Sequence, residues 1–165
     1  MKKIFRTLMV SLLLVAATAC DDSDEQVVPR YLDVNYVNVA GVWRLAEVNG
    51  IAQDENPYLY LVLNRRADED RDNLHTFESY DNMDSGLSRH SEGIYSIEAA
   101  EDELPVVSGY YDHGIGINLW EHDYYVTELT AERMVWTATD NPGDVSVYER
   151  CDAVPDDIVA GTRSF

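Results

Sequence analysis

The sequence predicts an all-β protein whose chain folds into an eight-stranded antiparallel up-and-down β-barrel. About eight short runs rich in β-branched and aromatic residues follow one another at intervals of roughly a dozen residues. Turn-forming pairs such as Asn49-Gly50 separate them, and no long amphipathic helical pattern occurs. Many short strands joined by short turns are typical of a barrel or a sandwich, and closing a barrel removes exposed sheet edges. A β-sandwich is the alternative architecture.

The expected strands follow from these runs. They cover residues 41–48, 58–63, 74–81, 92–98, 104–111, 117–129, 134–139 and 145–151. In the longest run, alternation places Trp120 and Val126 on one face and Leu129 on the other. Gly109 lies inside a strand, where glycine is typical of a bulge at which the wall bends.

The chain divides into four parts. Residues 1–19 are expected to be a lipoprotein signal peptide, 20–38 an acidic lipidated linker, 39–151 the barrel and 152–165 a C-terminal tail without assigned structure. The leader begins with positive charges and continues with an apolar stretch over residues 8–19. This stretch is too short for a membrane-spanning helix, which needs about 20 residues. It suits the apolar region of a signal peptide.

The leader ends in a sequence that places a cysteine after three small residues. Ala17-Thr18-Ala19-Cys20 resembles a bacterial lipobox, with alanine at position 17 where leucine is commonest. The resemblance implies that Cys20 is acylated and becomes the new N-terminus after cleavage, which anchors the protein to a membrane. Stable anchoring needs more than one acyl chain, and the cysteine of this family carries several. The alternative is ordinary cleavage after Ala19, which leaves a free thiol.

An acidic run follows the cysteine directly. Asp21-Asp22-Ser23-Asp24-Glu25 resembles the export signal of Bacteroidetes lipoproteins. The resemblance implies attachment to the outer membrane with the domain exposed at the cell surface. The alternative is a plain solvated linker, which anionic lipid would repel.

The chain is strongly acidic. It has 31 acidic residues against 12 basic ones, for a formal net charge of −19. Its only lysines, Lys2 and Lys3, lie in the leader. This charge repels phosphate backbones and therefore excludes nucleic acid as an expected partner.

Two short elements bracket the expected barrel. Gly41-Val42-Trp43 opens the first strand, and Arg150 lies near the end of the last strand. The pair resembles the lipocalin pattern, in which Gly-x-Trp begins the first strand and an arginine of the last strand packs over the indole. The resemblance implies an eight-stranded barrel closed by a cation–π contact between Arg150 and Trp43, worth about 0.5–2 kcal/mol.

A second stretch strengthens this resemblance. Residues 126–136 read Val-Thr-Glu-Leu-Thr-Ala-Glu-Arg-Met-Val-Trp. They resemble the Bacteroidetes lipocalin-like lipoproteins, where a hairpin of the form Leu-Thr, two to three polar residues and Met-Val precedes the final strand. The resemblance covers about residues 40–151.

The charged stretch 64–73 is expected to be a loop that faces solvent. Its alternating carboxylates, Asp68, Asp70 and Asp72, have the spacing of a calcium loop. Asn73 stands where an EF-hand needs glycine, so an EF-hand is excluded. A loose surface calcium site is the alternative to a solvated loop.

The remaining residues with metal-binding or nucleophilic chemistry predict no metal site, cofactor or catalytic group. The histidines show no zinc-ligand spacing and are expected at the surface: His75, His90, His113 and His122. Cys151 has no intramolecular partner if Cys20 is lipidated, and it is expected to be a small buried apolar residue. Phosphate-binding loops, dinucleotide fingerprints and nucleophile elbows are absent from the sequence.

These observations predict a lipid-anchored, non-enzymatic surface barrel that binds a small apolar or glycan ligand. Ligand access is expected at the end opposite Trp43 and Arg150, where four loops gather near residues 49–57, 82–91, 112–116 and 140–144. One alternative is a structural or protein-interaction module with a filled barrel. The other is an enzyme acting on polysaccharide, which would need two carboxylates facing each other across a cleft.

Overall fold

The computed structural model describes residues 30–84, 86–113 and 118–163. The signal peptide, Cys20 and the acidic run lie outside the described residues, as does most of the expected loop near 112–116.

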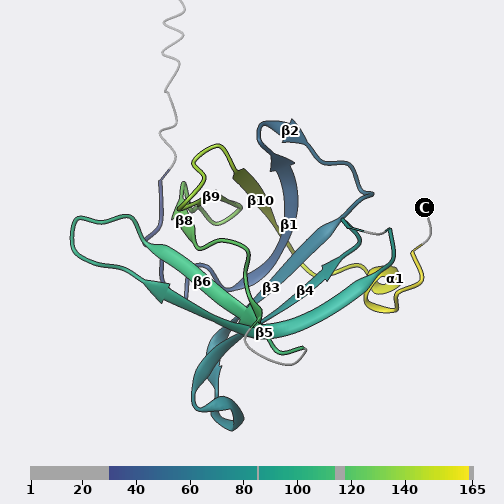
Figure 1. Ribbon diagram of the computed structural model, residues 1–165, viewed down its shortest axis with the longest axis horizontal. Helices are drawn as coiled ribbons and strands as arrows, with labels where there is room; N and C mark the ends of the chain where they lie inside the picture. The colour runs from purple at the N-terminus through teal and green to yellow at the C-terminus, as the bar shows by residue number, and fades with distance from the viewer. Residues whose placement is uncertain (1–29, 85, 114–117, 164–165) are drawn as a thin grey trace, which may run out of the picture.

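Eight antiparallel strands form a closed barrel (Figure 1), as predicted from the sequence. They are β1 (Gly41–Val48), β3 (Leu59–Asp68), β4 (Leu74–Asp81), β5 (Arg89–Glu98), β6 (Val106–Tyr111), β8 (Tyr124–Thr127), β9 (Arg133–Ala138) and β10 (Val145–Cys151). Each strand pairs with the next of the eight, and β10 returns to pair with β1. The short strands β2 (Ile51–Ala52) and β7 (Asn118–Leu119) add to β1 and β6. Helical structure in the described residues is limited to η1 (Glu69–Arg71) and α1 (Asp156–Val159).

Alternation of side chains explains which face of each strand is buried. In β4, Phe77, Ser79 and Asp81 are buried, whereas Glu78 and Tyr80 between them are only partly buried. The main cluster of buried apolar residues fills the inside of the barrel: Val39, Trp43, Leu45, Leu61, Leu63, Phe77, Tyr95, Val107, Val126, Leu129, Met134, Trp136 and Tyr148.

The seam between β1 and β10 closes the barrel. Trp43 faces Arg150 in the register of the two strands, and the guanidinium carbon of Arg150 lies 4.1 Å from the centroid of the Trp43 ring. Arg150 also donates hydrogen bonds to the backbone oxygens of Ala131 at 2.6 Å, Ala40 at 2.6 Å and Asn38 at 2.9 Å. The guanidinium therefore joins β10, the β8–β9 turn and the segment before β1.

Gly41 makes room for this guanidinium. A Cβ atom on Gly41 would lie 2.1 Å from Nη1 of Arg150, and its φ of +139° is rarely adopted by residues with a side chain. The glycine of the Gly-x-Trp element thus serves the same contact as the tryptophan.

A second apolar cluster lies outside the barrel wall. Ile158 of α1 is buried against Tyr58 and Tyr60, with Val42 and Cys151 partly buried beside them. The C-terminal tail, for which the sequence predicts no structure, therefore folds back on the outer face of β1 and β3. Cys151 is half-buried, and burial raises the pKa of its thiol.

Two expected elements differ from the structure. The stretch 64–73 is only partly a loop, because β3 continues to Asp68 before η1 begins. The Asp68 carboxylate accepts a hydrogen bond from the backbone N–H of Asp70 and so caps that short helix.

The expected long strand 117–129 is broken. β7 and β8 occupy its two ends, and residues 120–123 between them belong to no strand. Leu129 was expected to lie opposite Val126 but is buried in the same core. Glu128 has a φ of +49°, and this turn of the backbone after β8 ends the alternation.

Replacing Arg150 with alanine is expected to lower the free energy of unfolding by about 2–4 kcal/mol, because three carbonyl oxygens lose a charged donor and the indole loses its cation. Urea unfolding of the full chain measures this change. Arg66→Ala removes an exposed arginine of β3 and is the control, with an expected change within about 0.5 kcal/mol. Equal midpoints for the two variants would contradict the role of Arg150.

Candidate functional site

One end of the barrel is covered by the segment that precedes β1. The backbone N–H of Leu32 donates to the backbone oxygen of Leu129 at 2.7 Å, and the hydroxyl of Tyr36 accepts from the N–H of Ile97 at 3.1 Å. At this end of the barrel, the side chains of Leu32, Val34 and Tyr36 pack against the core. We call this the closed end, and the end where the β1–β3, β4–β5 and β9–β10 connections lie the open end.

A cavity of about 190 Å³ lies inside the barrel toward the open end. Its lining is Leu59, Leu61, Phe77, Ser79, Tyr111, Trp120, Glu121, Tyr124, Trp136 and Tyr148. We call it the lumen pocket. Its volume equals that of about six water molecules and is below the roughly 300–1,000 Å³ of pockets for drug-sized ligands. The lumen pocket therefore suits one ring-sized group.

The walls of the lumen pocket are aromatic rings in mutual contact. The ring centroids of Phe77 and Trp120 are 5.0 Å apart, those of Trp136 and Tyr148 5.1 Å, and those of Tyr124 and Trp136 5.3 Å. The pairs are tilted or edge-to-face, which is the favoured arrangement of aromatic side chains. Five different strands or connections contribute these rings, so the rigid barrel fixes the shape of the pocket.

Trp120 enters the lumen because Gly109 leaves space for it. A Cβ atom on Gly109 would lie 2.5 Å from the Trp120 ring. The backbone N–H of Trp120 donates to the Gly109 oxygen at 2.9 Å, which holds the irregular segment against β6. The irregularity expected at Gly109 lies on one side of β6: the pairing with β5 runs without a shift, whereas between the pair of Val107 with Tyr124 and the pair of Tyr110 with Leu119 the opposite chain has two extra residues.

Three phenol groups face the lumen pocket from Tyr111, Tyr124 and Tyr148. The hydroxyl of Tyr95 deeper in the core donates to the Asn64 backbone oxygen at 2.9 Å, but no hydrogen bond among the described residues involves the three pocket hydroxyls. Tyr148 is only 6% exposed. The three hydroxyls keep access to solvent, so a bound molecule that offers polar groups can replace water as their hydrogen-bond partner.

Burial keeps these phenols neutral. It raises the pKa of Tyr124 to about 12 and also raises the pKa of Tyr148 and of Tyr111. The carboxylates of Asp144 and Asp81 act in the same direction on Tyr148 and Tyr111 respectively. At neutral pH each hydroxyl can therefore both donate and accept a hydrogen bond.

Carboxylates surround the open end. Glu121 lines the lumen pocket with a side chain that is 88% exposed. Nδ1 of His122 lies 2.7 Å from Oδ1 of Asp140, and its Nε2 lies 3.7 Å from Oδ2 of Asp144. Asp81 is 5% exposed and accepts two hydrogen bonds from Arg89, at 3.1 and 2.9 Å.

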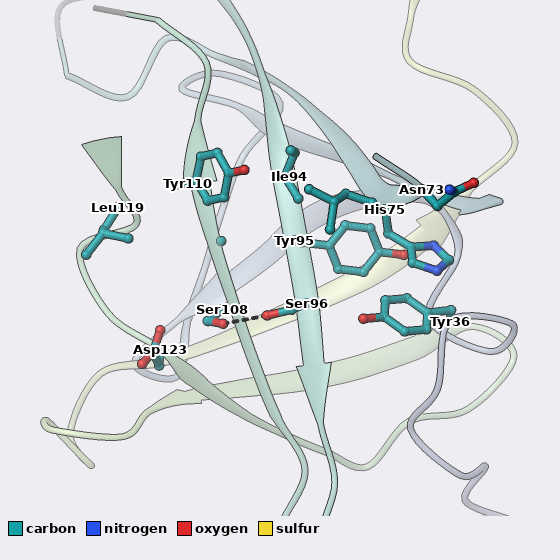
Figure 2. Close-up of a pocket in the computed structure, with 12 residues that line it drawn as sticks. Tyr36, Asn73, His75, Ile94, Tyr95, Ser96, Ser108, Tyr110, Leu119 and Asp123 are labelled. Atoms are coloured by element: carbon teal, nitrogen blue, oxygen red, sulfur yellow. Dashed lines mark hydrogen bonds between the residues drawn. The ribbon is translucent and has the colours of Figure 1, made fainter. Parts of the chain in front are cut away.

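A second cavity of about 450 Å³ lies outside the barrel, over β5 and β6. Figure 2 shows Tyr110, Leu119 and Asp123 at one side of this outer groove and the stacked rings of Tyr36 and His75 at the other. On its floor, the hydroxyls of Ser96 and Ser108 bond to each other at 2.9 Å. Because these polar groups satisfy one another, the outer groove is the weaker candidate.

The histidines and metal ligands differ in part from expectation. His90 and His113 are exposed, but His75 and His122 are half-buried, so the prediction of a surface position is wrong for these two. His75 is covered by the Tyr36 ring at a centroid distance of 3.6 Å. Within the described ranges, no group of three or more His, Cys, Asp or Glu side chains is arranged to hold a metal ion.

Among the described residues, the site residues predicted from the sequence do not line the lumen pocket. Trp43 and Arg150 meet at the closed end, and Cys20 lies outside the described residues. The pocket residues were missed, although alternation marks Phe77, Trp136 and Tyr148 as members of inward faces.

None of the helices in the described part of the chain has the length and apolar character needed to cross a membrane.

Comparison with protein-family models, with curated proteins and with solved structures found no match.

Raising the pH above about 10 is expected to destabilise the protein. The unfolded chain loses phenol protons near pH 10, whereas Tyr124 and Tyr148 keep theirs in the folded state, so the folded state binds more protons and stability falls as pH rises toward about 12. Urea unfolding at pH values of about 9, 10 and 11 measures the slope. Tyr148→Phe should make it shallower, and an unchanged slope would contradict the assignment.

Proposed function

We propose that this protein is a lipid-anchored surface barrel that binds one sugar unit of a glycan in the lumen pocket. The observation that supports it most directly is an aromatic pocket lined by three tyrosines, Tyr111, Tyr124 and Tyr148, whose hydroxyls make no hydrogen bond within the described residues. A sugar ring offers C–H faces that stack on aromatic rings and hydroxyls that bond to phenols. A purely apolar ligand would leave the phenols unpaired, which disfavours that class.

Anchoring is proposed at Cys20, with the outer membrane as the site of attachment. The lipobox-like Ala17-Thr18-Ala19 and the acidic run after Cys20 support this part of the proposal. We also propose membership of the Bacteroidetes lipocalin-like lipoproteins, supported by the Gly-x-Trp element and the 4.1 Å contact of Arg150 with Trp43. Cys20→Ala should move the protein from the membrane to the soluble fraction of cells, and retention in the membrane would contradict the anchor.

The second candidate is a protein-interaction module. The small volume of the lumen pocket favours it, because most of the barrel interior is filled by side chains. The outer groove, at about 450 Å³, would then be the larger recognition surface. Binding of sugars that depends on Trp120 would decide against this alternative.

Titration of the full-length protein in detergent with glucose, galactose and mannose, followed by tryptophan fluorescence, tests sugar binding. At least one sugar is expected to bind with a Kd on the order of 1 mM, as suits a single ring. Trp120→Ala, which removes a pocket wall, and Tyr148→Phe, which removes one hydroxyl, should each weaken binding at least about fivefold.

Tyr125→Phe is the matched control, because Tyr125 lies on β8 beside Tyr124 but has the opposite orientation in the strand. It should bind like the unmodified protein. Equal affinity for the Tyr148→Phe and Tyr125→Phe variants would contradict binding in the lumen pocket, and the absence of binding by every sugar would contradict the glycan proposal.

A further inference from the structure

We infer that the sugar unit bound in the lumen pocket carries a protonated amino group. This inference rests on the proposed function and narrows the class of ligand to amino sugars with a free amine. Three features of the pocket support it: carboxylates at the mouth, arginine charge that is already paired, and aromatic faces that attract cations.

The first feature is the net negative charge of three carboxylates at the mouth of the pocket, those of Glu121, Asp140 and Asp144. Glu121 lines the pocket itself. Asp144 lies 3.7 Å from Nε2 of His122, whose ring is 6.1 Å from that of Tyr124 in the pocket wall. Asp140 lies on the other side of the same imidazole, 2.7 Å from Nδ1. A positive charge placed among these groups would be stabilised, and a carboxylate on the ligand would be repelled.

The second feature is the pairing of the positive charge near the mouth. Burial raises the pKa of Tyr111, and the charge of Arg89 acts against this larger effect. The Arg89 guanidinium is already paired, because Nε and Nη2 donate to Asp81 and Nη1 lies 3.0 Å from Oδ2 of Asp84. His122 lies 3.9 Å from Glu121, 2.7 Å from Asp140 and 3.7 Å from Asp144, so a charge on it would offset one of three carboxylates. Three carboxylates beside one imidazole leave a net negative charge at the open end, which a cationic group of a ligand can offset.

The third feature is the wall of aromatic faces. A cation within about 6 Å of a tryptophan or tyrosine ring is attracted by the ring quadrupole, by about 0.5–2 kcal/mol according to its desolvation. Trp120, Trp136 and Tyr124 lie around a volume of about 190 Å³, so any group inside it is near several rings. An ammonium group would thus gain both from the rings and from the carboxylates.

A matched series of three sugars tests the inference: glucose, glucosamine and N-acetylglucosamine. They share one ring, and only glucosamine bears a positive charge at about pH 6.5. In titrations of the full-length protein at low ionic strength, glucosamine is expected to bind about tenfold more tightly than the other two. The preference should fall as salt is raised, because the carboxylates at the mouth are partly exposed.

Two variants connect the preference to the mouth of the pocket. Glu121→Gln and Asp144→Asn should each reduce the glucosamine preference to about threefold or less. Asp152→Asn removes the same charge from an exposed residue beyond β10 at the closed end and should leave the preference near tenfold.

The outcomes separate the two proposals. Equal binding of the three sugars, or a preference for a neutral sugar, would overturn the inference and leave the proposed function intact. A glucosamine preference that survives both Glu121→Gln and Asp144→Asn would overturn the assigned charges. Failure of all three sugars to bind would overturn the inference, and if galactose and mannose also failed to bind, the proposed function would be overturned as well.

Discussion

The contact between Arg150 and Trp43 is the interaction on which the barrel depends most. Closure requires the first and last strands to find each other across the whole length of the chain, and backbone hydrogen bonds alone fix neither their register nor their ends. One guanidinium binds three carbonyl oxygens from two other segments and covers the indole at 4.1 Å. Because arginine is planar and always charged, few other side chains can make all four contacts.

Closure in turn decides how the interior is filled. The inward-facing side chains of all the strands point toward the barrel axis, so large side chains must share the limited volume around it. Toward the closed end, the side chains of Trp43, Leu63 and Tyr95 are at most 2% exposed and occupy this volume. Toward the open end, Trp120 enters from outside the regular strands, and the pairing of β6 with β8 shortens to Val106 and Val107 on the β6 side. The lumen pocket is the space that this irregular segment leaves.

The sequence was sufficient to predict the architecture but not the pocket. Alternation and turns are local signals, and they placed β1, β4 and β10 within a residue of their observed bounds. The break at residues 120–123 depends on the contact of Gly109 with the indole of Trp120 across the β6–β7 pairing, which the alternation within either strand does not record. Helix α1 depends on Ile158 reaching Tyr58 and Tyr60, a contact across about a hundred residues of chain. Which inward aromatics meet, and what space they leave, follows from closure rather than from any single strand.

The path of the chain before β1 gives the barrel a direction. The described chain begins at residue 30 and runs across the closed end, where Leu32 bonds to Leu129. Ten residues separate Cys20 from residue 30, a tether that reaches at most about 35 Å when fully extended. The proposed anchor at Cys20 would therefore place the closed end toward the bilayer and the acidic mouth of the lumen pocket away from it. The same short tether would limit the protein to partners and polymers within a few nanometres of the surface that carries it.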